Sequence, residues 1–168
     1  MKEFSKILHV FRIAIFICIA TVPILVGCSN SKPKDPIQLQ FTLLKQLKSA
    51  SSDWQTTRVT HEAQDQDFRH TMCSAVILLN GRRYTLTAGD FEINSSIKVL
   101  PGDLDSLDKL TNDTRIGYFY TDLASKRFKD GGPSSGGSQN NYDSSTMQLL
   151  LPYAEQFRAA VREVLGIK

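Results

Sequence analysis

The sequence is poor in the residues that most catalytic and metal sites require. Its 168 residues include three cysteines and three histidines, and no histidine follows His70. No two cysteines have the C-x-x-C spacing of structural zinc sites. Basic and acidic side chains almost balance, at 20 and 17, so the chain lacks the strongly basic character of nucleic-acid-binding domains. We therefore expect no cofactor and no nucleic-acid partner.

Long apolar runs are also scarce, and the clearest one lies near the N-terminus. Residues 13–27 form an apolar block after the short basic region MKEFSKILHVFR. A basic region, about 7–15 apolar residues and a small-residue cleavage site are the parts of a secretory signal peptide. A membrane-spanning helix needs about 20 apolar residues, whereas this block is shorter and contains Pro23. We expect residues 1–27 to be a signal peptide that is removed.

The apolar block ends at a single cysteine, Cys28. With the preceding Leu25-Val26-Gly27 it resembles the lipobox of bacterial lipoproteins, in which a small residue precedes the cysteine. The resemblance covers residues 1–28 only. It implies that cleavage falls before Cys28, that its thiol carries a diacylglyceryl group, and that the new amino terminus is acylated. Several acyl chains, each methylene worth about 0.8 kcal/mol when buried, give stable anchoring in a membrane.

The residue after the cysteine bears on the destination. In lipoproteins of this type from enteric-like bacteria, an aspartate there favours retention in the inner membrane, and this chain has Ser29. The resemblance therefore implies the outer membrane, with the protein facing the periplasm. Residues 28–35 would form the lipidated cysteine and a short polar tether. Seven residues reach at most about 25 Å, so the folded part should lie close to the lipid headgroups.

Cysteine usage constrains the folded part further. If Cys18 leaves with the signal peptide and Cys28 is acylated, Cys73 is the only thiol that remains. No intramolecular disulfide can then form, although the compartment would allow one. We expect residues 36–168 to be a single globular domain, as is usual at this length. Its stability must come from its core.

An asparagine–glycine pair gives the clearest local prediction. Asn80 and Gly81 separate two β-rich runs in TMCSAVILLNGRRYTLTAG, and both residue types tolerate the positive φ of a tight hairpin turn. A two-residue turn pairs Cys73 with Ala88, Ile77 with Tyr84 and so on along the hairpin. Because side chains alternate along a strand, these residues share one mostly apolar face, which we expect to meet the core.

The other expected elements complete an α+β fold, a mostly antiparallel sheet with a C-terminal amphipathic helix packed on one face. Residues 37–43 alternate as in a strand, but the segment also fits a helix capped by Asp35, and the pattern does not separate these alternatives. The remaining expectations are a strand at 54–60, a loop at 61–69, a strand at 91–99, a short helix after Asp103, a strand at 116–120, a Gly/Ser-rich loop at 130–146, a strand at 147–151 and a helix from Pro152 to Gly166.

Two patterns are compatible with hydrolase chemistry. Residues 132–136 match G-x-S-x-G, with Ser134 as nucleophile, but that motif requires a strand, a helix and a later histidine. Cys73 and His70 could form a nucleophile–base pair. In a strand, however, the two residues would point to opposite faces, and an apolar face makes a thiol inert. We expect a buried, structural Cys73 and no catalytic residue.

The sequence contains several residue types that can bind a metal ion. The zinc ligands that the sequence offers are His61, His70 and Cys73, with Asp65 or Asp67. His61 and Glu62 begin an H-E-x-x-H pattern, but its fifth position is Asp65. The acidic residues between 103 and 113 lack the glycine and the distal glutamate of a calcium-binding EF-hand loop. We expect no metal site.

Three tyrosines are the candidate binding residues. Tyr142 lies in the loop at 130–146, whose Gly, Ser and Asn composition also occurs at adaptable binding surfaces. Long loops in compact domains are usually functional or disordered, so plain disorder is the alternative. Tyr118 and Tyr120 precede this loop in the chain.

The sequence thus predicts an envelope lipoprotein that is anchored to the membrane by the lipid on Cys28 and binds another protein of the envelope without catalysis. It could be an immunity-type protein against a toxin delivered to the periplasm, or an accessory subunit of a secretion or assembly machine. The alternative is a lipid-anchored periplasmic hydrolase that uses Cys73 and His70, or Ser134.

Overall fold

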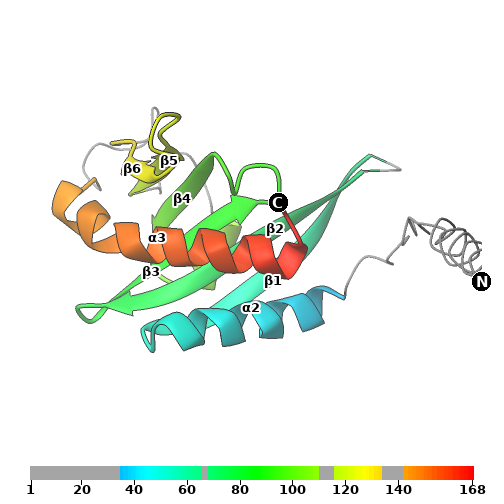
Figure 1. Cartoon of the computed structure of the whole chain (residues 1–168). Coiled ribbons are helices and arrows are strands. Elements are labelled where there is room, and N and C mark those ends of the chain that lie inside the picture. The colour runs from blue at the N-terminus through cyan, green and yellow to red at the C-terminus, as the bar shows by residue number, and fades with distance from the viewer. Residues whose placement is uncertain (1–34, 66–67, 110–115, 134–141) are drawn as a thin grey trace, which may run out of the picture. The chain divides into compact units, whose positions relative to one another are not determined.

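The computed structural model describes residues 35–65, 68–109, 116–133 and 142–168. The elements in these ranges follow the labels of Figure 1. They are the helix α2 (Pro36–Ala50), the strands β1 (Trp54–Asp65), β2 (Phe68–Leu79), β3 (Arg82–Gly89) and β4 (Ser96–Pro101), the short 3-10 helix η1 (Leu104–Lys109), the strands β5 (Gly117–Thr121) and β6 (Phe128–Asp130), and the helix α3 (Ser144–Leu165). Cys28 and the residues that follow it up to 34 lie outside the described residues.

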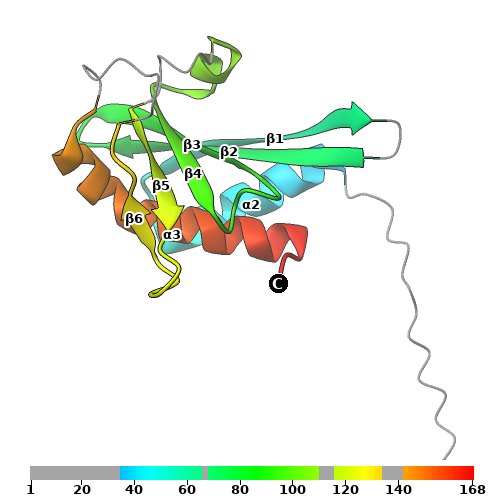
Figure 2. The same cartoon turned by 90° about the horizontal axis from the view of Figure 1, so that it is seen from above.

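The strands form one sheet in the order β1-β2-β3-β4-β5-β6, and each is antiparallel to its neighbours. The helices α2 and α3 lie on one face of this sheet, and η1 lies on the other (Figure 2). We call the face away from α2 and α3 the outer face. This arrangement confirms the expected α+β fold with a C-terminal helix packed on an antiparallel sheet.

Helix α2 resolves the alternative that the sequence left open at 37–43. The Asp35 carboxylate accepts a hydrogen bond of 3.0 Å from the backbone N–H of Ile37, and Pro36 occupies the first turn, where its missing N–H costs nothing. Leu39, Leu43 and Leu47 are buried at a spacing of four, which is the period of a helix that covers a core.

The hairpin of β2 and β3 has the predicted register. Cys73 lies opposite Ala88, and Ile77 lies opposite Tyr84. The turn residues Asn80 and Gly81 have φ values of 52° and 74°, the left-handed conformation that asparagine and glycine adopt most easily. The sequence therefore determined both the turn and the face that meets the core.

Two expectations about neighbouring strands were wrong. The polar segment 61–69 was expected to be a loop, but β1 continues to Asp65 and β2 begins at Phe68. Backbone pairing, as between Glu62 and His70, does not depend on apolar side chains. The expected strand at 91–99 begins only at Ser96, because the preceding N–H groups bond within turns, as Ile93 does to the Gly89 carbonyl at 2.9 Å.

The C-terminal region also differs from expectation. Residues 147–151 are not a strand, and Pro152 does not begin the helix, because α3 starts at Ser144 within the expected loop. Asp143 caps it by accepting from the Ser145 N–H at 3.1 Å. Pro152 faces solvent, where water can bond the carbonyl that proline leaves without a donor. The predicted end is correct, since Gly166 is the left-handed C-cap.

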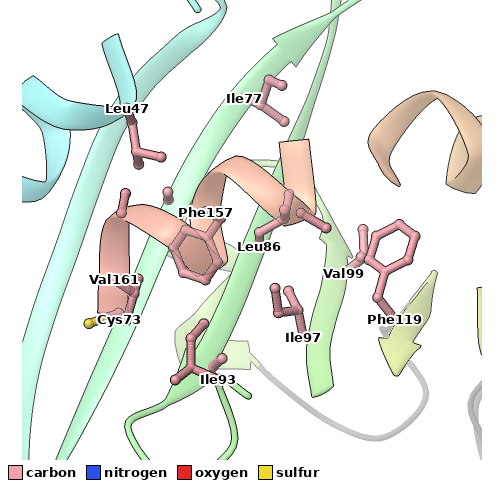
Figure 3. Packing of buried hydrophobic residues seen from close by; sticks show 14 of the residues in the cluster. Leu47, Cys73, Ile77, Leu86, Ile93, Ile97, Val99, Phe119, Phe157 and Val161 are labelled. Atoms are coloured by element: carbon pink, nitrogen blue, oxygen red, sulfur yellow. The ribbon is translucent and has the colours of Figure 1, made fainter. Parts of the chain in front are cut away.

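The buried face of α3 and the inner face of the sheet form one core. Figure 3 shows Phe157 and Val161 of α3 beside Leu86, Ile97 and other sheet residues. The helix contributes Met147, Leu150, Ala154, Phe157, Ala160, Val161 and Val164. These positions recur every three or four residues across Pro152, which explains why a single helix forms. Neither α2 nor α3 is long and apolar enough to cross a membrane.

Candidate functional site

One row of side chains crosses the entire sheet on its outer face. Each member is a register partner of the next, from β1 to the residue after β6. The residues lie one position away from core residues such as Cys73, so alternation directs them to the opposite face. We call this set the outer row. Its members in strand order are Arg58, Ser74, Thr87, Lys98, Tyr118 and Gly131.

The centre of the outer row is a buried pair of hydroxyl groups. Ser74 and Thr87 are only 4% and 2% exposed. Their hydroxyl oxygens lie 2.8 Å apart, and the Thr87 hydroxyl is 3.2 Å from the Cys73 carbonyl, to which it donates. The pair is therefore satisfied within the protein, as buried polar groups must be.

A pocket of about 250 Å³ lies over this part of the row. Ligand pockets for small molecules usually have about 300–1,000 Å³, so this pocket lies just below that range. Its charge is mixed, because Arg58 and Lys98 contribute cations and Glu62 a carboxylate, and Lys98 also pairs with Glu92 at 3.1 Å. The lining residues are Arg58, Thr60, Glu62, Met72, Ser74, Thr87, Lys98 and Leu107.

Two of the three predicted tyrosines lie at the β5 end of this face. Tyr118 belongs to the outer row, and Tyr120 is 40% exposed and pairs with Ser96 and Lys129. The Tyr118 ring rests against the backbone of Gly131, because a Cβ at that glycine would lie 2.3 Å from the ring. No side chain fits between them. The glycine thereby allows the aromatic ring to lie directly on the backbone.

Tyr142, the third predicted tyrosine, does not join them. Its hydroxyl donates to the Asp130 carboxylate at 2.6 Å, and its ring packs against the core cluster. Asp130 pairs with Phe119, a core residue, so this contact is on the side of the sheet that α3 covers. The structure therefore brings Tyr118 and Tyr120 together and separates Tyr142 from them.

Tyr142 instead lines a larger pocket of about 570 Å³ beside Arg82 and Arg83. Some of the charged side chains that line this pocket already interact with other residues of the protein. Arg83 lies 4.0 Å from Asp103. Asp143 accepts bonds from Thr146 and Ser145, and these bonds lower the pKa of its carboxyl group to about 2. The carboxylate that borders the pocket is thus engaged as a helix cap.

The residues of the hydrolase alternative are dispersed. Cys73 is 1% exposed, and burial, assisted by the negative charge of Asp90, raises the pKa of its thiol to about 12. His70 has the opposite strand parity and lies on the outer face, where its Nδ1 is 2.5 Å from Asp90 Oδ1 and its ring stacks on Phe91 at 5.3 Å. Ser134 lies outside the described residues.

The suspected metal ligands are likewise engaged elsewhere. His61 Nδ1 lies 3.0 Å from the Thr71 hydroxyl, and Asp103 accepts from the Asp105 N–H at 3.2 Å. Across the ranges that the structure describes, no three His, Cys, Asp or Glu side chains form a group that could hold a metal ion. Of Asp65 the structure describes only the backbone, and Asp67 lies outside the described residues.

Comparisons with protein-family models, curated proteins and solved structures gave no match to the chain. The candidate site therefore rests on its geometry. Sequence reasoning missed the cationic members of the outer row, Arg58 and Lys98. The alternation of side chains in the hairpin already predicted that Ser74 and Thr87 share the face away from the core. Placing Arg58 and Lys98 beside them required the order of the strands in the sheet.

Proposed function

We propose that the protein is a lipid-anchored lipoprotein of the bacterial envelope, and that its folded domain binds another protein through the outer face of its sheet without catalysing a reaction. The lipobox ending at Cys28 supports the anchor. The observation that carries the binding function is the outer row, in which an aromatic end and two cations share one face of the sheet.

The composition of this face fits a protein interface. Tyrosine and arginine are the residues that most often carry binding energy at such interfaces. Tyr120 and Leu78 are 40% and 39% exposed, and register places both on the outer face. Apolar contacts at these positions and a polar side chain in the 250 Å³ pocket would together give a partner both affinity and orientation.

The state of the candidate nucleophile disfavours the hydrolase alternative. A cysteine nucleophile reacts as the thiolate, whereas the Cys73 thiol is buried with a raised pKa. His70 lies across the sheet from it, against Asp90. A binding module of this size in the outer membrane, facing the periplasm, would suit an immunity-type protein or an accessory subunit of a secretion or assembly machine.

Capture from an envelope extract tests the proposal. The full lipoprotein, produced in a host that processes lipoproteins, is solubilised in detergent and used to retain its partner. We expect Tyr120→Ala to weaken retention at least about tenfold, as for an interface anchor. Leu149→Ala is the matched control, because Leu149 is a 50% exposed apolar residue on α3, on the other side of the molecule.

Two results would contradict the proposed function. The first is an equal loss of partner retention in Tyr120→Ala and Leu149→Ala, since the partner would then not bind specifically to the outer face. The second is a hydrolytic turnover by the purified protein that Cys73→Ala abolishes, since it would make the protein an enzyme. If the Cys73→Ala variant still captures a partner in stoichiometric amount, the result agrees with the proposal.

A further inference from the structure

Helix α2 presents apolar side chains to solvent on the side opposite to its buried leucines. Ile37 and Phe41 are 63% and 66% exposed. Each lies two residues from a buried leucine, Leu39 or Leu43, which is about 200° around a helix. Leu44, one turn after Phe41, is partly exposed. These three residues form a continuous stripe, because positions three and four apart are neighbours on a helix surface.

Two lysines extend this stripe. Lys45 is four residues after Phe41, and Lys48 is four residues after Leu44. Both are exposed, and the sequence of α2, PIQLQFTLLKQLKSA, contains no carboxylate. We call Ile37, Phe41, Leu44, Lys45 and Lys48 the α2 stripe. Apolar side chains flanked by lysines are the pattern of a helix that lies in the interface of a membrane with anionic lipids.

The position of α2 in the chain identifies what meets this stripe. We propose that the α2 stripe lies on the surface of the bilayer that holds the lipid anchor. This inference rests on the proposed anchor at Cys28. Asp35, the cap of α2, is seven residues after that cysteine, and seven residues span at most about 25 Å. The tether therefore holds the start of the stripe within reach of the headgroups.

The exposed apolar area of the stripe argues against a second copy of the chain as its occupant. Its two largely exposed apolar side chains, Ile37 and Phe41, would bury roughly 300 Å² if fully covered, at about the value for an aromatic residue each. A stable protein interface buries about 800 Å² per partner. A membrane contact has no such minimum here, since the acyl chains already supply the attachment and the stripe only orients the domain.

Contact of the α2 stripe with the bilayer would also determine which way the outer row points. The helices α2 and α3 lie on the face opposite the outer row (Figure 2). Contact of α2 with the bilayer would therefore turn the outer row toward the aqueous compartment, where a partner can reach it. The anchor would then fix which way the binding face points as well as its distance from the membrane.

A single introduced thiol tests this inference. In the lipidated protein Cys28 is blocked and Cys73 is 1% exposed, so a cysteine at position 41 is the one that a water-soluble maleimide reaches. Phe41→Cys is labelled with an environment-sensitive dye, and the lipoprotein is reconstituted into phosphatidylethanolamine vesicles containing phosphatidylglycerol. Leu123→Cys is the control, because Leu123 is 83% exposed between β5 and β6. Ile37→Cys provides a second reporter on the stripe if Phe41→Cys does not fold.

We expect the dye at position 41 to be quenched by nitroxide-bearing lipid and shielded several-fold from aqueous iodide relative to position 123. Lys45→Glu combined with Lys48→Glu should remove most of this shielding while the protein stays bound to the vesicles. Equal access of iodide to positions 41 and 123, in protein that floats with the vesicles, would overturn the inference and leave the anchor intact. Shielding that requires an added envelope protein would also overturn it.

A failure of the anchor would look different. Protein that does not float with the vesicles, and whose Cys28 thiol itself accepts the maleimide, would contradict the proposed function at its first step. The two failures are thus distinguished by flotation and by the labelling of Cys28.

Discussion

The two faces of the sheet are built from adjacent residues of the same strands, yet they differ in almost every property. On the inner face, Cys73, Ala75 and Ile77 are at most 1% exposed and belong to the same apolar core as the buried residues of α2 and α3. On the outer face, Ser74 lies between them in sequence and makes a hydrogen bond to Thr87. The inner face supplies stability, whereas the outer face carries polar and aromatic groups that a packed core does not need.

The largest predicted effect is on the inner face. Phe157 is fully buried and stacks on Trp54 with ring centroids 6.4 Å apart. Phe157→Ala should lower the free energy of unfolding by about 3–5 kcal/mol, since it leaves a cavity that the sheet cannot close. Urea unfolding followed by Trp54 fluorescence measures it. A loss below about 1 kcal/mol would mean that this face is not the main source of stability.

A smaller effect is predicted where Gly131 meets Tyr118. Gly131→Ala places a Cβ 2.3 Å from the ring, so the ring must move, and we expect a loss of about 1–3 kcal/mol together with weaker partner retention. A double-mutant cycle with Tyr118→Ala checks the cause. In the Tyr118→Ala variant, Gly131→Ala should lower the free energy of unfolding only slightly. If Gly131→Ala causes the same loss of stability with and without the Tyr118 ring, the contact between them is not responsible.

The buried hydroxyl pair gives the next prediction. Thr87→Val leaves the Ser74 hydroxyl without its partner and should cost about 1–3 kcal/mol. Adding Ser74→Ala should recover part of that loss, because the remaining unpaired hydroxyl is removed. Thermal unfolding of the single and double variants measures the difference. If the double variant is less stable than Thr87→Val alone, the Ser74 hydroxyl stabilises the fold by some other interaction than its hydrogen bond to Thr87.

The smallest effect concerns alkaline pH. Burial raises the pKa of Cys73 from 9.0 to about 12. Because the folded value is the higher one, the contribution to stability is complete below about pH 9 and is lost as pH rises toward 12. The stability of Cys73→Ala should therefore fall less than that of the natural chain between pH 8 and 10.5, as measured by the urea midpoint. Parallel curves would contradict the burial of this thiol.

Local signals predicted the elements that depend on adjacent residues. Asn80 and Gly81 determined a turn, and with it the register of β2 against β3. Asp35 and Pro36 indicated a helix start, but the alternating pattern at 37–43 competed with it until the burial of Leu39 and Leu43 was known. Pro152 was misread as the beginning of α3, because its place on the exposed side of a longer helix depends on which face packs against the sheet.

The candidate site was less accessible to sequence reasoning. Tyr142 was predicted from the composition of its loop, and Tyr118 and Tyr120 were added because they lie nearby in the chain. Tyr118 and Tyr120 share the outer face, whereas Tyr142 bonds to Asp130 on the other side of the sheet. Arg58 and Lys98 are 40 residues apart in sequence and belong to one row because three strand pairings connect β1 to β4. Such long-range pairing cannot be derived from local patterns.

The membrane anchor is the claim on which the orientation of both faces depends. Mass spectrometry of the protein isolated from its native host tests it directly. We predict an N-terminal peptide that begins at Cys28 and carries a diacylglyceryl group on the thiol and a fatty acid on the amino group. A mature chain that begins elsewhere, or one with an unmodified Cys28, would contradict the account.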